Sequence, residues 1–191
     1  MLAVATNDLA AAEESPANTG TITASPNPAA IGTLTQAEAR ADFDRLRKAL
    51  EEAHAGLYRY STKAKMDRAF DTQRAKLNRS MRKTEFMEVV GETLAGIRCG
   101  HTSCRPDDEM QTAATSARKF PLRGLIERRR LLVLFNDTPD DQTIRPGMEV
   151  IEINGHKVAE ILSRFFRIQS ADGDIETSKR VSSQEGFGEL Y

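Results

Sequence analysis

The chain has 191 residues, of which 39% are hydrophobic, enough to bury one sizeable core or two small ones. Its 27 lysines and arginines nearly balance 28 aspartates and glutamates, so a net charge of -1 gives no field for a polyanion and argues against nucleic acid as the partner. No stretch approaches the roughly 18 consecutive apolar residues of a membrane-spanning helix, and two cysteines are too few for a disulfide scaffold.

Residues 1–33 are rich in Ala, Thr, Ser, Asn and Pro and contain few large apolar side chains. Because so little apolar surface cannot offset the entropy lost on ordering, we expect a disordered leader. The first residues also lack the basic and the long apolar regions of an intact export signal. Either the protein stays in the cytosol, or its signal is absent from this sequence.

Residues 34–106 have the pattern of three amphipathic helices. Thr35-Gln36-Ala37-Glu38 fits a capping box, in which the threonine oxygen accepts from a first-turn amide and Glu38 reaches back. The apolar residues that recur at helical spacing are Phe43, Leu46, Leu50, Ala53 and Leu57, then Met66, Phe70 and Leu77 in a helix starting near Thr62, then Phe86, Val90, Leu94 and Ile97 in a helix starting near Lys83. Short connections predict a three-helix bundle.

Residues 107–168 change to a β-rich pattern, after a polar stretch over 107–119 that lacks periodicity. Strands are expected at Phe120–Ile126, at Leu131–Phe135 and at Glu149–Ile153, which runs into the hairpin signal Asn154-Gly155. Helical spacing returns between Lys157 and Ile168. The expected fold class is therefore α+β, and residues 169–191, with weak periodicity, are interpreted as the start of a linker.

The stretch IRPGMEVIEINGHKV, from Ile144 to Val158, resembles the PDZ modules that are inserted in tail-specific proteases. The shared pattern is a proline and a glycine, an apolar strand that ends in Ile-Asn-Gly, and a valine after two further residues. A PDZ module adds an extended peptide to a sheet edge and captures its terminal carboxylate with backbone amides. A scaffold module without a ligand of its own is an equally open interpretation.

The third expected helix ends in LAGIRCGHT, from Leu94 to Thr102. This resembles the point at which many tail-specific (C-terminal-processing, tricorn-like) serine peptidases carry Asp-Gly-His-Thr, with the histidine as general base in several branches. Gly100 fits a helix C-cap that presents His101 away from the bundle, and an imidazole can take a serine proton near neutral pH and return it to the leaving amine. Cys99 departs from the family's aspartate, which implies an altered loop or a degenerate copy.

The resemblance spans Leu34 to Tyr191 and implies the N-terminal portion of a peptidase that hydrolyses polypeptides, with the PDZ-like module binding or gating substrate. The family's nucleophile and orienting acid come from a downstream α/β domain, which we expect to be missing here. Ser103, Ser163 and Ser170 lack a glycine-flanked elbow, so this fragment alone is predicted to be inactive. No cofactor is implied. Because relatives are commonly exported in bacteria, the cell envelope is favoured over the cytoplasm.

Two alternatives stay open. One is a non-catalytic PDZ-like peptide-binding protein with a degenerate active site. The other is a redox or zinc switch at Cys99, His101 and Cys104, since two thiolates and an imidazole are good zinc ligands, although a fourth ligand is lacking and no metal site is expected. In an exported protein, a bridge from Cys99 to Cys104 would stiffen the histidine loop.

The remaining polar candidates have structural interpretations. His54 lies at the end of the first expected helix, where the helix dipole favours it, and His156 follows Asn-Gly as a turn residue. Asp172 and Asp174 flank Gly173 without the further oxygen ligands of a calcium loop, so they predict a turn.

Overall fold

The computed structural model describes residues 2–5, 31–117, 119–138, 141 and 143–187, so most of the expected disordered leader lies outside the described residues. Within them the chain mixes helices with two small antiparallel sheets, which agrees with the expected α+β class. Its contacts define two compact units. The helical unit comprises the described residues within Pro28–Ser116 and Arg167–Lys179, and the sheet unit comprises those within Met1–Asn27, Ala117–Phe166 and Arg180–Tyr191.

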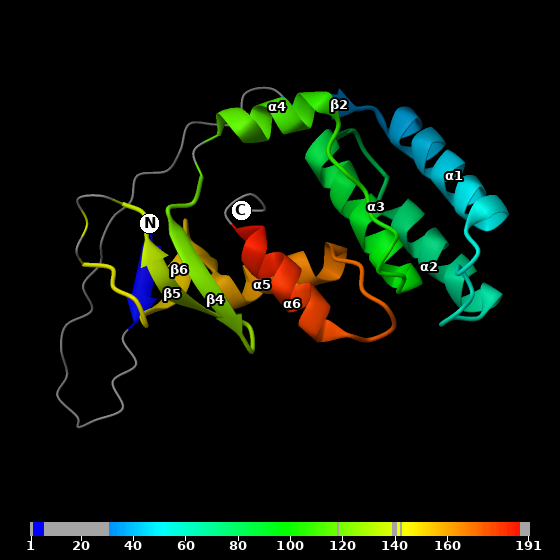
Figure 1. Ribbon diagram of the computed structural model, residues 1–191. Helices are drawn as coiled ribbons and strands as arrows, with labels where there is room; N and C mark the ends of the chain where they lie inside the picture. Colours follow the sequence, from blue (N-terminus) through cyan, green and yellow to red (C-terminus); the bar gives the residue numbers. More distant parts are fainter. Residues whose placement is uncertain (1, 6–30, 118, 139–140, 142, 188–191) are drawn as a thin grey trace. The chain divides into compact units, whose positions relative to one another are not determined.

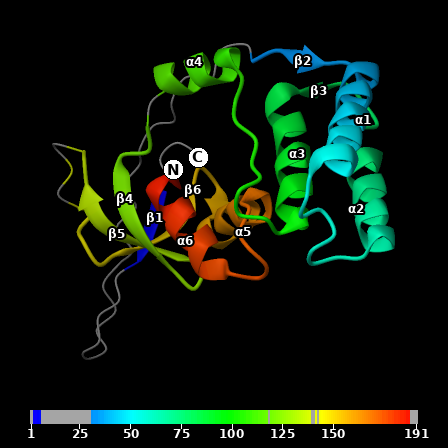
Figure 2. The ribbon, with the colours of Figure 1, turned by 45° about the vertical axis from the view of Figure 1, so that its right-hand side comes forward.

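The helical unit is built from four helices and one short strand pair: α1 Gln36–Ala53, α2 Lys63–Ala75, α3 Lys83–Ile97, α4 Asp108–Ser116, and β2 Thr33–Leu34 paired with β3 Met81–Arg82. Helices α1, α2 and α3 lie side by side (Figure 1, Figure 2). Their core consists of Ala39, Phe43, Leu50, Leu57, Met66, Phe70, Leu77, Met81, Val89, Leu94 and Ile97. Ala53, which was expected in this core, is exposed at the end of α1.

Side chains near their first turns fix where these helices begin. The capping box at Thr35 is confirmed, because its hydroxyl oxygen accepts from the Glu38 amide at 3.2 Å and its own amide donates to the Glu38 carboxylate at 2.8 Å. Thr62 caps α2 through its hydroxyl oxygen, which accepts from the Lys65 amide at 3.3 Å. In α3, the Glu85 carboxylate accepts from the Arg82 amide at 2.8 Å. All three predicted helix starts are therefore confirmed.

The sheet unit contains an antiparallel sheet in the order β1-β6-β5-β4, with β7 paired to β6. Its elements are β1 Leu2–Ala5, β4 Leu122–Glu127, β5 Arg130–Asn136, β6 Glu149–Ile153, β7 His156–Lys157, α5 Val158–Ile168 and α6 Glu176–Glu185. The last residues of α5 and the first residues of α6 belong to the helical unit. The core consists of Leu122, Ile126, Leu131, Val133, Ile144, Val150, Ile153, Val158, Ile161, Leu162, Phe165, Phe166 and Phe187.

Two tight turns connect strands of this sheet. Asn154 and Gly155 adopt φ values of 52° and 83° between β6 and β7, as the Asn-Gly signal predicts. Between β4 and β5, Arg128 and Arg129 adopt φ values of 45° and 68°. Both residues of each turn are left-handed, which matches the twist of a two-residue hairpin. Between β4 and β5, two arginines adopt this conformation without a glycine.

Several features were not expected from the sequence, among them the helix α6 in the stretch interpreted as a linker. Helix α4 lies in the polar stretch 107–119, where the Asp107 carboxylate accepts from the Met110 amide at 2.9 Å and starts the helix without an apolar stripe. Strand β1 pairs with β6 in a region interpreted as leader. In the expected linker, Phe187 is buried, and its ring centroid lies 5.3 Å from that of Phe120 and 5.6 Å from that of Phe165.

Among the described residues, no helix combines the length and apolarity needed to cross a membrane.

Candidate functional site

The loop that carries His101 begins where α3 ends, inside the helical unit. The chain turns at Arg98, which adopts the left-handed conformation with φ 62° and ψ 38°. The expectation that Gly100 supplies this cap is therefore wrong. A non-glycine residue pays about 1 kcal/mol or more for the left-handed region, so contacts of the Arg98 side chain must offset that cost.

Arg98 makes those contacts with two distant segments. Its guanidinium donates to the Asp174 carboxylate at 2.8 Å and to the Tyr60 carbonyl, and it lies over the Tyr60 ring at 5.3 Å from the centroid. Its own carbonyl accepts from the Gly173 amide at 3.0 Å. Arg98 thus joins the end of α3 to the Asp-Gly-Asp turn, where Gly173 has a φ of 58°.

Asp172 brings a carboxylate to the histidine loop from 71 positions further along the chain. One carboxylate oxygen, Oδ1, accepts from the Gly100 amide at 2.9 Å. Ligand atoms of Asp172, Cys99 and His101 all lie within 4.8 Å of one another. Ser170 supports the same contact, because its hydroxyl donates to the Thr102 carbonyl at 2.6 Å. The segment from 170 to 174 therefore holds the loop from 98 to 102.

His54 supports the loop from the end of α1. Its Nδ1 accepts from the Gly56 amide at 3.1 Å, so the ring proton of the neutral tautomer is on Nε2. Nε2 lies 2.7 Å from the Thr102 hydroxyl oxygen and donates to it. The structural interpretation of His54 agrees with these bonds. His156 lies on β7 of the sheet unit and is exposed.

The two cysteines differ in their surroundings. Both are free thiols, and both pack partly buried against the helical core. Burial raises the pKa of the Cys104 thiol above its ordinary value, so Cys104 stays protonated near neutral pH. In the described part of the chain, the side chains gathered around His101 are those of Cys99 and Asp172, instead of the Cys99 and Cys104 pair that the sequence suggested.

Comparison with models of known protein families finds none that matches this chain, and comparison with curated proteins finds no match either. Of the serines considered from the sequence, Ser163 and Ser170 donate their hydroxyl protons to the carbonyls of Ala159 and Thr102.

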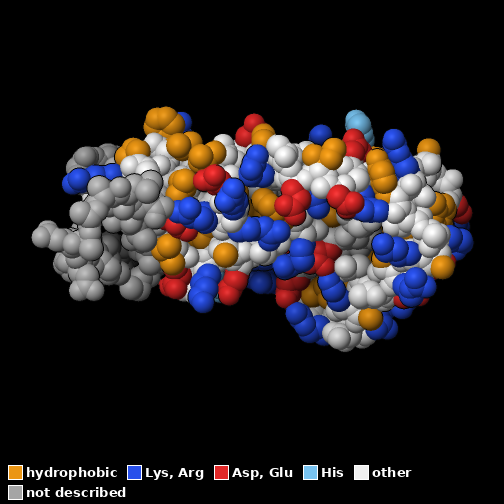
Figure 3. Space-filling model, turned by 90° about the horizontal axis from the view of Figure 1, so that it is seen from below, with side chains coloured by type: hydrophobic (Ala, Val, Ile, Leu, Met, Phe, Trp, Pro, Cys, Tyr) orange, Lys and Arg blue, Asp and Glu red, His pale blue; other side chains and the backbone are white. Residues whose placement is uncertain are grey.

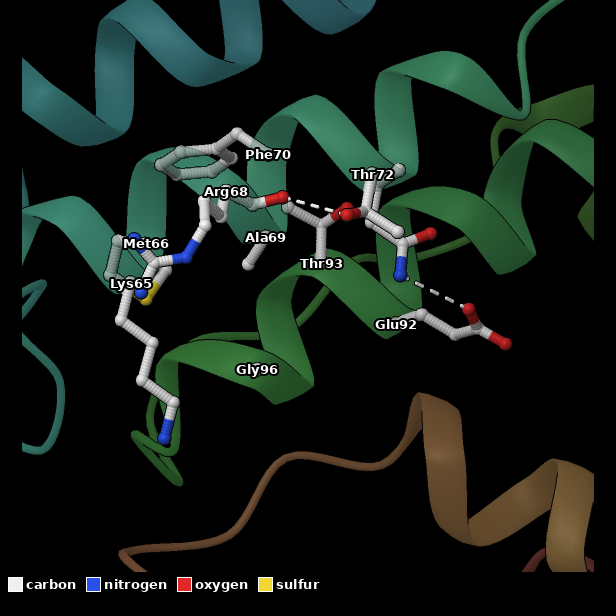
Figure 4. A pocket seen from close by; sticks show the side chains of 10 residues that line it. Lys65, Met66, Arg68, Ala69, Phe70, Thr72, Glu92, Thr93 and Gly96 are labelled. Atoms are coloured by element: carbon white, nitrogen blue, oxygen red, sulfur yellow. Dashed lines mark hydrogen bonds between the residues drawn. The ribbon is translucent and has the colours of Figure 1, made fainter.

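A hollow between α2 and α3 is lined by residues of these two helices and by none of the histidine loop (Figure 4). Glu92 at its rim accepts from Gln73 at 3.2 Å, from Arg167 at 3.2 Å and from Lys76. Partial burial acts to raise the pKa of Glu92, but the hydrogen bonds from Lys76 and Arg167 outweigh it and lower the pKa. This carboxylate has the surroundings of a structural ion pair.

Charge is evenly distributed on the face that Figure 3 shows, where Lys and Arg side chains are interspersed with Asp and Glu. This agrees with the net charge of -1. The described residues on this face offer no single-sign field for a charged polymer.

Proposed function

We propose that this chain is the N-terminal part of a serine-type peptidase of the tail-specific family, and that His101 is its general base. The observation that carries the proposal is the carboxylate of Asp172, which comes within 4.8 Å of the ligand atom of His101 from 71 positions away. A catalytic histidine needs a group that orients its ring and stabilises the imidazolium. The family resemblance places the orienting acid in a downstream domain, and the proposal differs from it here, because Asp172 would supply that function within this chain.

The proposed reaction uses His101 twice. Its neutral ring nitrogen takes the proton of a serine hydroxyl while the serine oxygen attacks the peptide carbonyl, and the imidazolium then gives that proton to the leaving amine. Water repeats the sequence to release the acyl group. The exposure of His101 supports this role, since a base must reach a substrate.

The nucleophile is proposed to come from a segment outside these 191 residues, as the family resemblance implies. Ser163 and Ser170 support this placement, because their hydroxyl protons are already donated to backbone carbonyls. The fixed loop supports it as well: His54, Ser170 and Asp172 each hydrogen-bond the stretch from Gly100 to Thr102. A base held in a fixed position is already oriented for a nucleophile that lies on another segment.

The sheet unit is proposed to be a PDZ-like module that binds or gates the polypeptide, and α1 to α3 a three-helix bundle. Support comes from the apolar strand β6, the Asn154-Gly155 turn and the following helix α5. Among the described residues β4 pairs with β5 alone, which leaves a strand edge for an added peptide. On that edge the Ile126 amide donates to the Gln184 side chain at 3.2 Å, so an added peptide would replace Gln184.

A second candidate is a peptide-binding protein without catalysis. The observation that favours it is the apolar surface of the sheet unit, where Leu125, Leu134 and Ile151 are exposed on three strands. Exposed apolar side chains of this kind are typical of interaction surfaces. This candidate keeps the PDZ-like module and treats Cys99 as the sign of a lost active site.

Peptide hydrolysis by the full-length product of the same reading frame tests the proposal. His101→Ala should lower kcat/KM by about 10³-fold or more. Asp172→Asn should also lower it, because the amide oxygen still accepts from Gly100 while the negative charge that would stabilise the imidazolium is lost, and Asp172→Ala should lower it further. His156→Ala, in the other unit, is the matched control and should leave hydrolysis unchanged. Full activity of His101→Ala would refute the proposal, and absence of hydrolysis by the wild type would favour the peptide-binding candidate.

A further inference from the structure

The histidine loop gathers three different metal-ligating groups in one place. The sulfur of Cys99, a ring nitrogen of His101 and a carboxylate oxygen of Asp172 lie within 4.8 Å of one another. Zinc binds such atoms at about 2.0 to 2.3 Å in tetrahedral geometry, which places neighbouring ligand atoms about 3.4 to 3.6 Å apart. The three side chains would therefore close by little more than about 1 Å around an ion.

The backbone already holds these residues in position. Asp172 accepts from the Gly100 amide through Oδ1, which leaves Oδ2 as the oxygen that would face an ion. A hydrogen bond to the second oxygen of a ligating carboxylate is the usual way in which proteins orient such a ligand. The Arg98 carbonyl and the Ser170 hydroxyl fix the two segments on either side of this contact.

The chemistry of the group favours zinc over the hard cations. A thiolate and an imidazole are soft or borderline ligands, whereas magnesium and calcium require oxygen atoms. Cys99 is the better of the two cysteines for this purpose, because it lies beside His101 and Asp172 while burial keeps Cys104 a thiol. Three protein ligands leave a fourth position for water, as in zinc sites that stay open.

We propose that Cys99, His101 and Asp172 bind one zinc ion. Binding takes the lone pair of the His101 imidazole, and the Cys99 thiol releases its proton to solvent when its sulfur joins the metal. Occupied by zinc, His101 has no lone pair with which to accept a serine proton. The ion is therefore an inhibitor of the peptidase, and this consequence rests on the proposed function, whereas the site itself does not.

Cobalt titration of the reduced 191-residue chain tests the site directly. The wild type should bind one equivalent of Co²⁺ with the near-ultraviolet absorption of a cobalt–thiolate bond, and Zn²⁺ should displace it because zinc binds such sites more tightly. Cys99→Ser should abolish this absorption, and His101→Ala and Asp172→Asn should weaken binding about tenfold or more. The matched controls Cys104→Ser and His156→Ala should bind as the wild type does.

The site is refuted if the folded wild type binds no stoichiometric cobalt, or if Cys99→Ser and Cys104→Ser give the same cobalt–thiolate absorption. Circular dichroism of each variant confirms that it is folded. Inhibition is measured separately on the full-length enzyme, which zinc should inhibit and a chelator restore, with Cys99→Ser resistant. Cobalt binding without any peptidase activity would keep the site and refute the proposed function. Hydrolysis that requires His101, without cobalt binding, would keep the function and refute the site.

Discussion

The bond between His54 and Thr102 should be a measurable link between the end of α1 and the histidine loop. The Nε2 atom of His54 lies 2.7 Å from the Thr102 hydroxyl oxygen, and Nδ1 is committed to the Gly56 amide at 3.1 Å. Thr102→Val removes the acceptor while keeping the shape of the side chain. His54→Ala removes the donor. A double-mutant cycle of these two changes isolates the bond.

The expected magnitude follows from burial and chemistry. Both side chains are partly buried, and a neutral hydrogen bond contributes about 1 kcal/mol net, with a further penalty of about 1 kcal/mol when a donor is left without a partner. Thr102→Val should therefore lower the free energy of unfolding by about 1 to 2 kcal/mol. His54→Ala, which also removes the bond to Gly56, should lower it by about 2 kcal/mol. The coupling between them should be about 1 kcal/mol.

Urea unfolding followed by tyrosine signal measures this in the unit concerned. The chain has no tryptophan and three tyrosines, so a Tyr191→Phe background leaves only Tyr58 and Tyr60, both in the helical unit. As a control, Thr72→Val removes a hydroxyl that donates within α2, and it should be additive with His54→Ala. If the Thr102 cycle is equally additive, to within about 0.3 kcal/mol, the bond does not stabilise the loop and the account of its rigidity is wrong.

Three further changes have definite expected outcomes. A hydrogen bond from Arg79 and one from the Arg82 amide lower the pKa of Glu85 from 4.5 to about 2, so Glu85→Gln should lower the free energy of unfolding at pH 7 by about 1 kcal/mol after solvent screening. Because the stabilisation is present above pH 4.5 and lost as the pH falls toward 2, the difference in urea unfolding should shrink by more than half at pH 3. Gly124→Ala places a Cβ 2.4 Å from a Leu131 methyl and 2.9 Å from the Leu132 carbonyl oxygen on β5. This overpacking should lower the free energy of unfolding by about 2 kcal/mol, measured by thermal unfolding. An unchanged melting temperature would contradict the close contact between β4 and β5 at this position. In α3, a Cβ added at Gly96 would have no neighbouring atom within 4 Å. Gly96→Ala should therefore raise the free energy of unfolding by about 0.5 to 1 kcal/mol, because alanine favours a helix over glycine. A lower melting temperature of this variant would contradict the open surroundings of Gly96.

Local sequence signals predicted much of the fold. The capping box at Thr35, the start of α2 at Thr62 and the Asn154-Gly155 turn depend on residues within a few positions of one another, and each is confirmed. Helix α4 was missed because an aspartate cap and ion pairs support it, without an apolar stripe. Phe187 was missed because its partners are distant in the sequence.

The candidate site was predicted only in part. His101 followed from a short motif, and its loop lies after α3 as expected. The residue in the left-handed conformation is Arg98 and not Gly100, although local rules favour glycine at such a position. Contacts of Arg98 with Asp174 and Tyr60 offset the conformational cost that a non-glycine residue has in this region. From the sequence, Asp172 was predicted only as part of a turn. Its approach to Gly100 and His101 comes from tertiary contacts, which the spacing of residues in one sequence does not encode.

We propose that His101 activates a serine, and the rate of fluorophosphonate labelling of the full-length product of this reading frame tests this role. We expect labelling of a single serine in the wild type and in His156→Ala, and a rate lower by about 10³-fold or more in His101→Ala, because the serine then lacks its base. Labelling of His101→Ala at the wild-type rate would contradict the claim.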